Sequence, residues 1–519
     1  MDVYWAMIAK VKSLGVIGIE GYVVDVEVDI SKGIPSYTLV GLPDASVKES
    51  KERVRSAIKN SGIKFPYSKI VVNLAPGNTR KEGALYDLPI ALGVMLCTQE
   101  LLFTEKVDEF AFVGELGLDG EIRRVNGILP ILIAASKMGI KKIIIPTANA
   151  GEAAFIKGIT VFVANSLRDV VDALNGTNLE GIRRVEKKSF EELKSVTRHV
   201  FDLKYVRGQF IAKRALEIAA AGGHNILLIG PPGSGKTMLA KCFPTILPDL
   251  TFEESIEASK IHSIAGVLDA NQGIIVSRPF RAPHHTASLV ALTGGGKNSK
   301  PGEISLAHFG VLFLDEMPEY PRASLEMLRQ PLEDNTITIS RASATVEYPA
   351  AFTLIASMNP CPCGNYGSRI QRCTCTQTAI QKYLSKLSGP LMDRIDLHIE
   401  VDNVTYDDLT AKGQGEPSTV VKTRVDKARE YQLARFSGKN IFSNSKMMEV
   451  DIKDYCVLDD KSKEILRLAF EKLQLSARAY SRILRVARTI ADLEDSEDIL
   501  PEHISEAVGY RSLDRKYSG

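Results

Sequence analysis

Cysteine is scarce in this sequence, and its placement is uneven. The 519 residues include 7 cysteines, and four of these lie between Cys361 and Cys375. Disulfide frameworks are typical of small secreted chains with many cysteines, whereas a tight group of thiols is typical of a metal site. The cysteine content therefore argues against a disulfide-stabilised protein and favours local metal binding.

Long apolar runs and an excess of one charge are also lacking. No apolar run approaches the roughly 18 residues of a membrane-spanning helix, and residues 1–5 lack the basic and apolar regions of a signal peptide. We therefore expect a cytoplasmic protein with no membrane partner. With 65 basic and 63 acidic residues the net charge is +2, so the overall charge of the chain does not indicate nucleic-acid binding. A local basic surface remains compatible with this balance.

The sequence does have an ordinary globular composition, over a length that exceeds one compact core. Hydrophobic residues make up 45% and charged residues 25% of the chain. We predict an α/β fold, with an α/β domain over residues 1–175, a polar linker over 176–198 and a second α/β unit over 199–401. Residues 402–519 read as helical. In the first domain, the strict alternation of apolar and acidic residues over 24–30 indicates a half-buried strand.

A phosphate-binding loop is the strongest motif. It fits G-x-x-x-x-G-K-[ST], and it stands between an apolar strand and a helix-like segment. Such a loop wraps phosphates with backbone N–H groups, and the helix N-terminus adds its positive dipole end. Lys236 would reach the β- and γ-phosphates, and the Thr237 hydroxyl would hold Mg²⁺. The loop comprises Gly230, Pro231, Pro232, Gly233, Ser234, Gly235, Lys236 and Thr237. The motif therefore predicts that the chain binds ATP with Mg²⁺.

Two later apolar strands end in side chains that suit ATP hydrolysis. The strand 311–314 is followed by Asp315 and Glu316, and the strand 353–358 is followed by Asn359. Asp315 would support Mg²⁺, and Glu316 would polarise the attacking water. Asn359 would orient that water beside the γ-phosphate. The pattern predicts an ATP hydrolase.

From the phosphate-binding loop onward, the order of these elements resembles that of the AAA+ ATPases. The resemblance implies that Val206 and Gln209 belong to the segment that lines the adenine pocket. It also implies that Arg478 contacts the γ-phosphate from a helical lid. On a helix Arg478 would share one face with Arg482 and Arg485, so a solvated basic face is the alternative.

Arg394 matches the arginine finger of the same superfamily. Such a finger reaches the nucleotide of a neighbouring subunit and stabilises the transition state there. The resemblance thus implies a homo-oligomeric ring, usually a hexamer. The alternative is an ion pair within the chain, with Asp393 or Asp396.

Several longer phrases narrow the resemblance. They are residues 41–44 (GLPD), 278–288 (RPFRAPHHTAS), 301–308 (PGEISLAH) and 328–333 (LRQPLE). Together they closely resemble the ComM/YifB family of magnesium-chelatase-like ATPases over nearly the entire chain. The resemblance implies ATP-driven branch migration of DNA in natural transformation by a hexameric ring.

The sequence offers its own candidates for contact with single-stranded or branched DNA. A hairpin is expected over residues 336–348, with Arg341 at the start of its turn. A glycine-rich loop follows Thr293 and carries Lys297 and Lys300. In the family both elements point into the channel of the ring, where basic side chains would contact phosphates without sequence preference. Ordinary solvated loops are the alternative for each.

The N-terminal domain resembles the proteolytic domain of Lon proteases, which uses a serine nucleophile and a lysine base. Leu85, in residues 81–87, stands in the place of the serine, and Leu129, in residues 125–129, stands in the place of the lysine. Leucine can neither attack a carbonyl nor accept a proton. We therefore expect a domain without peptidase activity that binds DNA or organises the ring.

The four clustered cysteines form two C-x-C pairs. Four thiolates would close a tetrahedral, structural Zn²⁺ site in the loop after Asn359, although C-x-C is tighter than the usual C-x₂-C spacing. Reduced free thiols are the alternative. The candidate ligands are Cys361, Cys363, Cys373 and Cys375.

The motifs together lead to one main hypothesis and two alternatives. The main hypothesis is an oligomeric AAA+ ATPase that moves on DNA and drives branch migration. One alternative is the motor subunit of a metal chelatase, against which the fused Lon-like domain argues. The other is a regulatory or chaperone-like scaffold whose assembly ATP switches.

Overall fold

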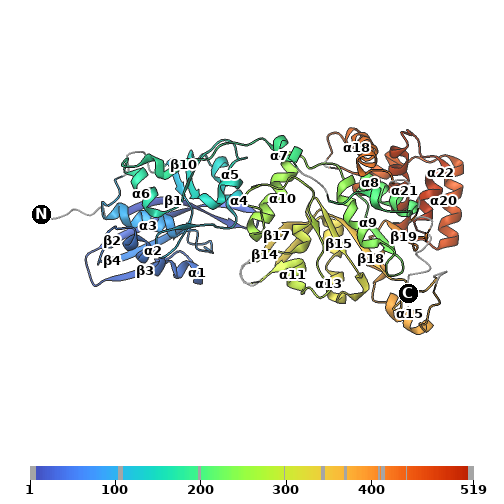
Figure 1. Ribbon diagram of the computed structural model, residues 1–519, viewed down its shortest axis with the longest axis horizontal. Coiled ribbons are helices and arrows are strands. Elements are labelled where there is room, and N and C mark those ends of the chain that lie inside the picture. The colour runs from blue at the N-terminus through green and yellow to red at the C-terminus, as the bar shows by residue number, and fades with distance from the viewer. Residues whose placement is uncertain are drawn as a thin grey trace. The chain divides into compact units, whose positions relative to one another are not determined.

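The fold is that of a computed structural model, which describes residues 8–102, 109–196, 200–296, 299–340, 345–367, 371–406, 410, 415–439 and 441–511 (Figure 1). The chain divides into two compact units. Unit 1 comprises Met1–Val196, Phe252–Val276 and Gly296–Lys300, and unit 2 comprises Thr197–Thr251, Ser277–Gly295 and Pro301–Gly519. Both units combine helices with a sheet, which confirms the predicted mixed α/β class.

Unit 1 is built on an eight-stranded mixed sheet in the order β10-β9-β8-β5-β1-β2-β4-β3. Its centre is the long antiparallel pair β1 and β2, and the alternation predicted for residues 24–30 lies in β2, where every second side chain is buried. The strands are β1 (Ile8–Ile17), β2 (Glu20–Ser31), β3 (Ser36–Val40), β4 (Lys69–Ala75), β5 (Phe110–Phe112), β8 (Lys142–Pro146), β9 (Thr160–Ala164) and β10 (Ile182–Arg184), beside the short pair β6 (Glu115–Leu116) and β7 (Ile122–Arg123).

Helices of unit 1 share its apolar core with the strands of the sheet. Nearly every side chain of α3 is buried, which matches its almost continuous apolar sequence. The helices are α1 (Ala45–Lys48), α2 (Ser50–Asn60), α3 (Asp87–Cys97), α4 (Ile128–Lys137), α5 (Ala150–Ala153), α6 (Leu167–Leu174), α7 (Phe190–Val196) and α10 (Phe252–Ala265).

One part of unit 1 comes from far along the chain. Residues 252–276, which lie within the range expected for the second α/β unit, contain α10 and pack on α4. Ile274 and Val276 share a small buried cluster with Ala154 and Phe155. Phe252 meets Phe190 edge to face, with ring centroids 5.6 Å apart. Apolar burial therefore joins this insertion to unit 1.

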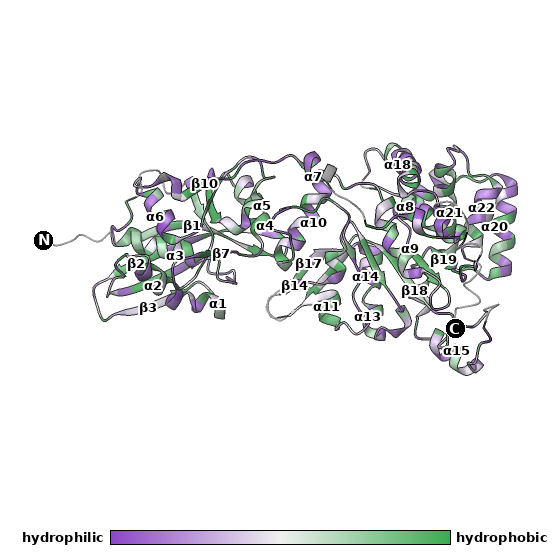
Figure 2. Cartoon of the chain, in the orientation of Figure 1, coloured by the Kyte–Doolittle hydropathy of each residue, from purple (hydrophilic) through white to green (hydrophobic). Residues whose placement is uncertain are grey.

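Unit 2 is built on a five-stranded parallel sheet in the order β12-β15-β18-β11-β19. Its central strands are buried on both faces, as expected of a parallel sheet covered by helices, and they appear as hydrophobic ribbons in Figure 2. The sheet consists of β11 (Ile226–Ile229), β12 (Phe280–Arg281), β15 (Val311–Leu314), β18 (Thr353–Met358) and β19 (Leu397–Glu400). The short strands β13 (Gly294–Gly295), β14 (Lys300–Pro301) and the hairpin strands β16 (Thr336–Ser340) and β17 (Thr345–Pro349) lie outside this sheet.

The helices of unit 2 fall into two groups along the chain. The first contains α8 (Phe210–Gly222), α9 (Lys236–Cys242), α11 (Leu289–Thr293), α12 (Glu303–Leu306), α13 (Arg322–Glu326), α14 (Arg329–Asp334), α15 (Gln377–Leu384) and α16 (Gly389–Met392). The second, here called the C-terminal helices, contains α18 (Ser418–Arg435), α19 (Glu449–Tyr455), α20 (Asp460–Leu473), α21 (Ala477–Leu493) and α22 (Pro501–Gly509). Within the described ranges, no helix is both long and apolar enough to cross a membrane.

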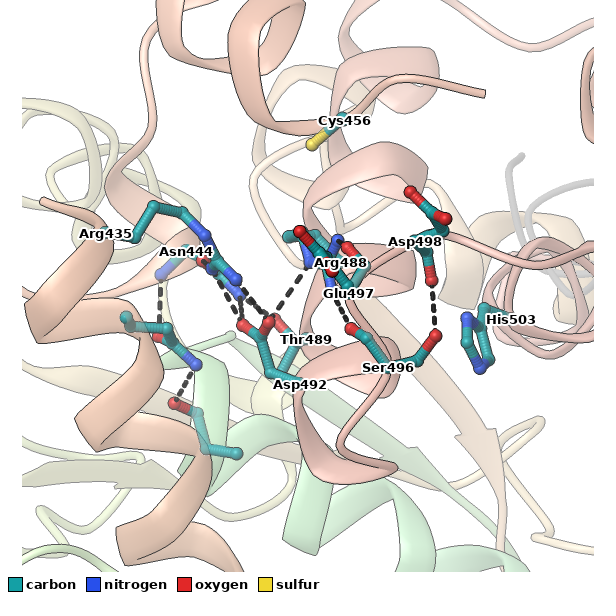
Figure 3. Close-up of polar contacts among 12 residues, drawn as sticks. Arg435, Asn444, Cys456, Arg488, Thr489, Asp492, Ser496, Glu497, Asp498 and His503 are labelled. Atoms are coloured by element: carbon teal, nitrogen blue, oxygen red, sulfur yellow. Dashed lines mark hydrogen bonds and ion pairs between the residues drawn. The ribbon is translucent and has the colours of Figure 1, made fainter. Parts of the chain in front are cut away.

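The C-terminal helices enclose a buried polar network (Figure 3). Asp492 on α21 accepts hydrogen bonds from Arg435 on α18, from Asn444 and from Arg488. Thr489 extends the network to His224, at 2.8 Å from Nε2 to Oγ1. Buried charges need such partners, so the network fixes how α18 and α21 pack.

Candidate functional site

The phosphate-binding loop connects β11 to α9 in unit 2. β11 is fully buried, and α9 begins at Lys236, directly after Gly235. Gly235 has a φ of +89°, a conformation that glycine adopts without strain. The strand, loop and helix predicted from the motif are therefore present.

Lys236 lies against the loop that precedes it. Its Nζ donates to the carbonyls of Gly230 at 2.7 Å and Pro231 at 2.9 Å, and to Asn359 Oδ1 at 3.3 Å. Burial lowers the pKa of Lys236, against the opposing charges of Asp315 and Glu316. The ammonium is thus held at the mouth of the loop by weak acceptors that phosphate oxygens would replace.

Thr237 and Asp315, the predicted magnesium ligands, lie within hydrogen-bond distance of each other. Thr237 Oγ1 donates to Asp315 Oδ2 at 2.9 Å. The other carboxylate oxygen of Asp315 accepts a hydrogen bond from the Ser357 hydroxyl, which also accepts from the backbone N–H of Glu316 at 3.2 Å. A hydroxyl and a carboxylate are hard oxygen ligands that fit Mg²⁺. Ser357 was not among the predicted residues, although a serine within an otherwise apolar strand is a signal that could have identified it.

Glu316 follows Asp315 and projects toward solvent. Its φ is +52°, and its side chain is 56% exposed. His285 Nδ1 lies 3.7 Å from Glu316 Oε2. The carboxylate is therefore free to meet a water molecule, with an imidazole beside it.

Val206 and Gln209 precede α8. Val206 is buried, and its carbonyl accepts from Lys213 Nζ at 2.6 Å. Gln209 Nε2 donates to the carbonyl of Ser234, at 3.2 Å, and to that of Asp402, at 2.6 Å. This segment therefore adjoins the phosphate-binding loop, which is the placement that an adenine-lining role requires.

Arg394 forms an ion pair within the chain, but with neither of the two partners that the sequence suggested. It is 3% exposed, and it pairs with Glu333 at the end of α14. Its Nη1 also donates to the carbonyl of Pro390 at 2.5 Å. Burial lowers the pKa of Arg394, and Nε has no hydrogen-bond partner among the described residues. Glu333 was missed because it lies 61 positions away in sequence.

The three arginines of α21 differ in their surroundings. Arg478 is exposed. Arg482 pairs with Asp396 and donates to the carbonyl of Arg394 at 3.1 Å. Burial opposes ionisation of Asp396, but Arg482 and His224 hold its pKa well below the ordinary range. Arg485 is partly buried, and burial lowers its pKa. A solvated basic face therefore describes Arg478 alone.

The four cysteines of the loop after Asn359 converge. Their Sγ atoms all lie within 4.8 Å of one another. Cys361 Sγ is 3.4 Å from that of Cys363 and 3.8 Å from that of Cys373, and the last two are 3.6 Å apart. Tetrahedral Zn²⁺ with Zn–S bonds of about 2.3 Å would place its sulfurs about 3.8 Å apart. Cys375 completes the group, so the donor set fits a structural Zn²⁺ ion.

The DNA-binding candidates are only partly covered. Lys300 is exposed at the start of β14. Lys297 and Arg341 lie outside the described residues, but the strands β16 and β17 on either side of residues 341–344 form the predicted antiparallel pair.

In unit 1, Leu85 and Leu129 are both buried, and neither carries a reactive group. The backbone N–H of Leu129 lies 3.2 Å from Glu152 Oε2 and 3.4 Å from Ser263 Oγ. Glu152 also accepts from Asn149, at 2.9 Å, and burial raises its pKa.

Comparison with known proteins gives the same family along most of the chain. The model for magnesium chelatase, subunit ChlI, matches residues 202–409, that for subunit ChlI of Mg-chelatase matches 26–149, and that for the ChlI C-terminal part matches 415–511. Over 130 residues, 24% of this chain and 22% of the other, the sequence is 28% identical to Lon protease 2 of Bacillus subtilis.

Two relatives match over nearly their full length. Competence protein ComM of Haemophilus influenzae is 45% identical over 510 residues, which cover 98% of each chain. The YifB protein of Escherichia coli is 45% identical over 501 residues, which cover 96% of each chain. The phrases that suggested this kinship therefore belong to a similarity that extends through both units, and this chain belongs to the ComM/YifB family of magnesium-chelatase-like AAA+ proteins.

Proposed function

We propose that this protein is an ATP-driven motor that acts on single-stranded or branched DNA, as a branch-migration helicase. The observation that carries the proposal is the convergence of Lys236, Asn359, Thr237 and Asp315 around the phosphate-binding loop. These groups come from three neighbouring strands of one parallel sheet, whose carboxyl ends are the usual position of a nucleotide site.

Each side chain has one task in hydrolysis. Lys236 exchanges its carbonyl partners for phosphate oxygens, while Thr237 and Asp315 hold Mg²⁺. Mg²⁺, when bound, neutralises charge on the phosphates. Ser357 orients the Asp315 carboxylate through its hydrogen bond. Glu316 accepts a proton from the attacking water, and Asn359 positions that water.

A homo-oligomeric ring, with six subunits as the expected number, completes the site. Arg394 would act on the nucleotide of a neighbour, and Arg478 would act from the C-terminal helices. In the single chain Glu333 holds Arg394, so ring assembly would exchange this ion pair for a phosphate contact. Val206 and Gln209 would border the adenine base.

Action on DNA is supported by the relative named competence protein ComM and by basic candidates at two loops. Lys300 is exposed. Lys297 and Arg341, which lie outside the described residues, are predicted from the sequence to lie in the glycine-rich loop and in the hairpin turn. Leucines stand at positions 85 and 129, where Lon proteases carry their serine and lysine, so we assign unit 1 to DNA binding or ring organisation. We place the protein in the cytoplasm.

Paired variants test the ATPase assignment. Lys236→Ala should abolish ATP binding, and Glu316→Gln should bind ATP yet lower turnover by at least about 100-fold, since general base catalysis contributes that much. Lys241→Ala, an exposed lysine on the same helix, and Glu319→Gln, an exposed acid three residues on, are the matched controls. Normal hydrolysis by Glu316→Gln would show that another group activates the water.

The motor and scaffold hypotheses separate on DNA. The motor hypothesis expects single-stranded or branched DNA to stimulate hydrolysis, the protein to resolve branched substrates, and Arg341→Ala with Lys300→Ala to weaken both effects. Absence of stimulation over a range of salt concentrations would favour the ATP-switched scaffold, because phosphate contacts weaken with salt. A chelatase-type motor would instead respond to a porphyrin-binding partner protein.

We also propose that Cys361, Cys363, Cys373 and Cys375 hold one structural Zn²⁺ ion. Four protein ligands leave no open position, so the ion would stabilise the loop and take no part in chemistry. Metal analysis should find about one zinc per chain, and less zinc after Cys361→Ser with Cys373→Ser. A zinc content near zero in protein purified under reducing conditions would leave the thiols free.

A further inference from the structure

The cysteine loop begins directly at the nucleotide site. Asn359, whose Oδ1 accepts from Lys236 Nζ at 3.3 Å, is followed two residues later by the buried Cys361. Cys361 starts a tight turn, in which its carbonyl accepts from the Gly364 N–H at 2.9 Å and its Sγ accepts from the Tyr366 N–H at 3.3 Å. The first cysteine is therefore fixed by the backbone next to a residue of the ATP site.

The same turn lies against the phosphate-binding loop. A Cβ atom at Gly364 would lie 2.4 Å from Cδ and 2.9 Å from Cγ of Pro232. These distances are shorter than atoms tolerate, and a proline ring is fixed to its own backbone. The Gly364 backbone is thus packed directly on Pro232, and only glycine fits there, also because its φ is +81°.

A small cavity lies between the two loops. It measures about 240 Å³ and is lined by Pro231, Pro232, Cys363, Asn365, Gln371 and Asn403. The cysteine loop and the phosphate-binding loop thus line the same cavity. A predicted metal ligand and predicted ATP-binding residues therefore border one cavity.

We propose that the cysteine loop, closed by Zn²⁺, is a buttress that holds the phosphate-binding loop at Pro232 and thereby sets the affinity of the protein for ATP. This inference rests on the zinc site proposed above. The ion would join Cys361 and Cys363, which directly precede Gly364, to Cys373 and Cys375 later in the chain, and such a cross-link restricts the conformations of the turn. Without the ion, the turn at Gly364 would no longer hold Pro232 in place. ATP would then have to order the phosphate-binding loop itself, at a cost in affinity.

A matched pair of glycine variants tests the contact. Gly364→Ala places a methyl group against Pro232, whereas Gly438→Ala, at a φ of +80°, meets no atom within 4 Å. Backbone strain is thus the same in both, and only the contact differs. We expect Gly364→Ala to keep its zinc and to weaken MgATP binding about tenfold by calorimetry, and Gly438→Ala to stay within twofold of the unaltered protein.

A double-mutant cycle tests the contact between Gly364 and Pro232, and zinc removal tests whether the ion affects ATP affinity. With Pro232→Ala as the background, the added effect of Gly364→Ala should fall to about twofold, because the ring it strikes is gone. An unchanged tenfold effect would refute the contact. In the unaltered protein, removal of zinc by a chelator should also weaken MgATP binding about tenfold, and zinc readdition should restore it. Zinc that can be removed with no change in ATP affinity would overturn the buttress and leave the zinc site intact, whereas absence of zinc would refute the site itself.

Discussion

The buried carboxylate of Asp492 should be the residue on which the C-terminal helices most depend. Its side chain is 1% exposed, and it faces two arginines, Arg435 and Arg488 (Figure 3). Arg435 Nη1 and Nη2 lie 2.9 and 2.5 Å from its oxygens, Arg488 Nε lies at 3.1 Å, and Asn444 Nδ2 lies at 2.8 Å. The substitution Asp492→Asn keeps the shape of this side chain and removes its charge.

The expected loss follows from the partners left behind. Both arginines remain charged, and the new amide presents one oxygen and one NH₂ group to four donors. Breaking a buried ion pair by removal of one partner costs about 3 to 5 kcal/mol. Arg488 retains the carbonyls of Ser496, at 2.5 Å, and Glu497, at 2.7 Å, so we do not expect a larger loss. We therefore expect Asp492→Asn to lower the free energy of unfolding of the C-terminal helices by about 3 to 5 kcal/mol.

Urea denaturation followed by circular dichroism measures this loss, and hydrogen exchange of the α18 and α21 amides locates it. Glu464→Gln is the matched control, because Glu464 also forms a two-pronged pair with an arginine, Arg467, at 2.6 and 2.9 Å, but on the exposed side of α20. Solvent screens that pair, so the control should leave the transition midpoint unchanged. The reasoning is refuted if Asp492→Asn shifts the midpoint no further than Glu464→Gln.

Three further predictions concern other parts of the molecule. Burial raises the pKa of Asp87 to about 6 despite its hydrogen bonds to Arg53, so between about pH 4 and pH 6 the folded protein holds a proton that the unfolded chain has lost. The free energy of unfolding should therefore fall by up to about 3 kcal/mol as the pH rises from about 4 to about 6. Urea titrations at several pH values should show this slope, and Asp87→Asn should remove it. Ser357→Ala should lower ATP turnover about tenfold, with a higher Mg²⁺ requirement, because Asp315 loses the hydroxyl that orients it; an unchanged Mg²⁺ titration would assign Ser357 a packing role only. A fragment of residues 197–519 should aggregate, because it exposes the apolar side chains of residues 252–276, which pack in unit 1. Light scattering should detect the aggregates, and replacement of residues 252–276 by a Gly/Ser linker should prevent them.

The parts of the candidate site that could be predicted from the sequence are those formed by residues close to one another in the chain. Lys236 and Thr237 belong to a single loop whose backbone conformation the glycines fix, so the motif specifies the local structure. Asp315 and Asn359 were predictable for a related reason, since polar side chains that follow apolar strands of a parallel sheet meet at one edge. Four cysteines within a short loop likewise had few ways to lie apart.

The parts that sequence could not predict depend on contacts between distant segments. Nothing near Arg394 indicates that Glu333 is its partner, and nothing near Asp396 indicates that Arg482 reaches it from α21, 86 positions later. Such pairs form because burial leaves a charge with no water, and the nearest opposite charge is determined by the packing of helices, not by sequence spacing. The contact of Gly364 with Pro232 is of the same kind, because a glycine in a loop gives no sign of what packs against it.

A contact between distant segments in the interior of unit 1 shows why residues 252–276 belong to this unit. Glu152 is buried, and its carboxylate is satisfied by three donors: the Leu129 N–H, Asn149 and the Ser263 hydroxyl, the last at 2.5 Å. Two of these donors belong to the first part of the chain, but Ser263 belongs to the insertion that follows the phosphate-binding loop in sequence. A buried carboxylate deprived of one donor is costly, so residues 1–175 alone would leave Glu152 short of a partner. Leu129, at the position of the Lon lysine, and Ser263, which follows the phosphate-binding loop in sequence, therefore both donate hydrogen bonds to Glu152.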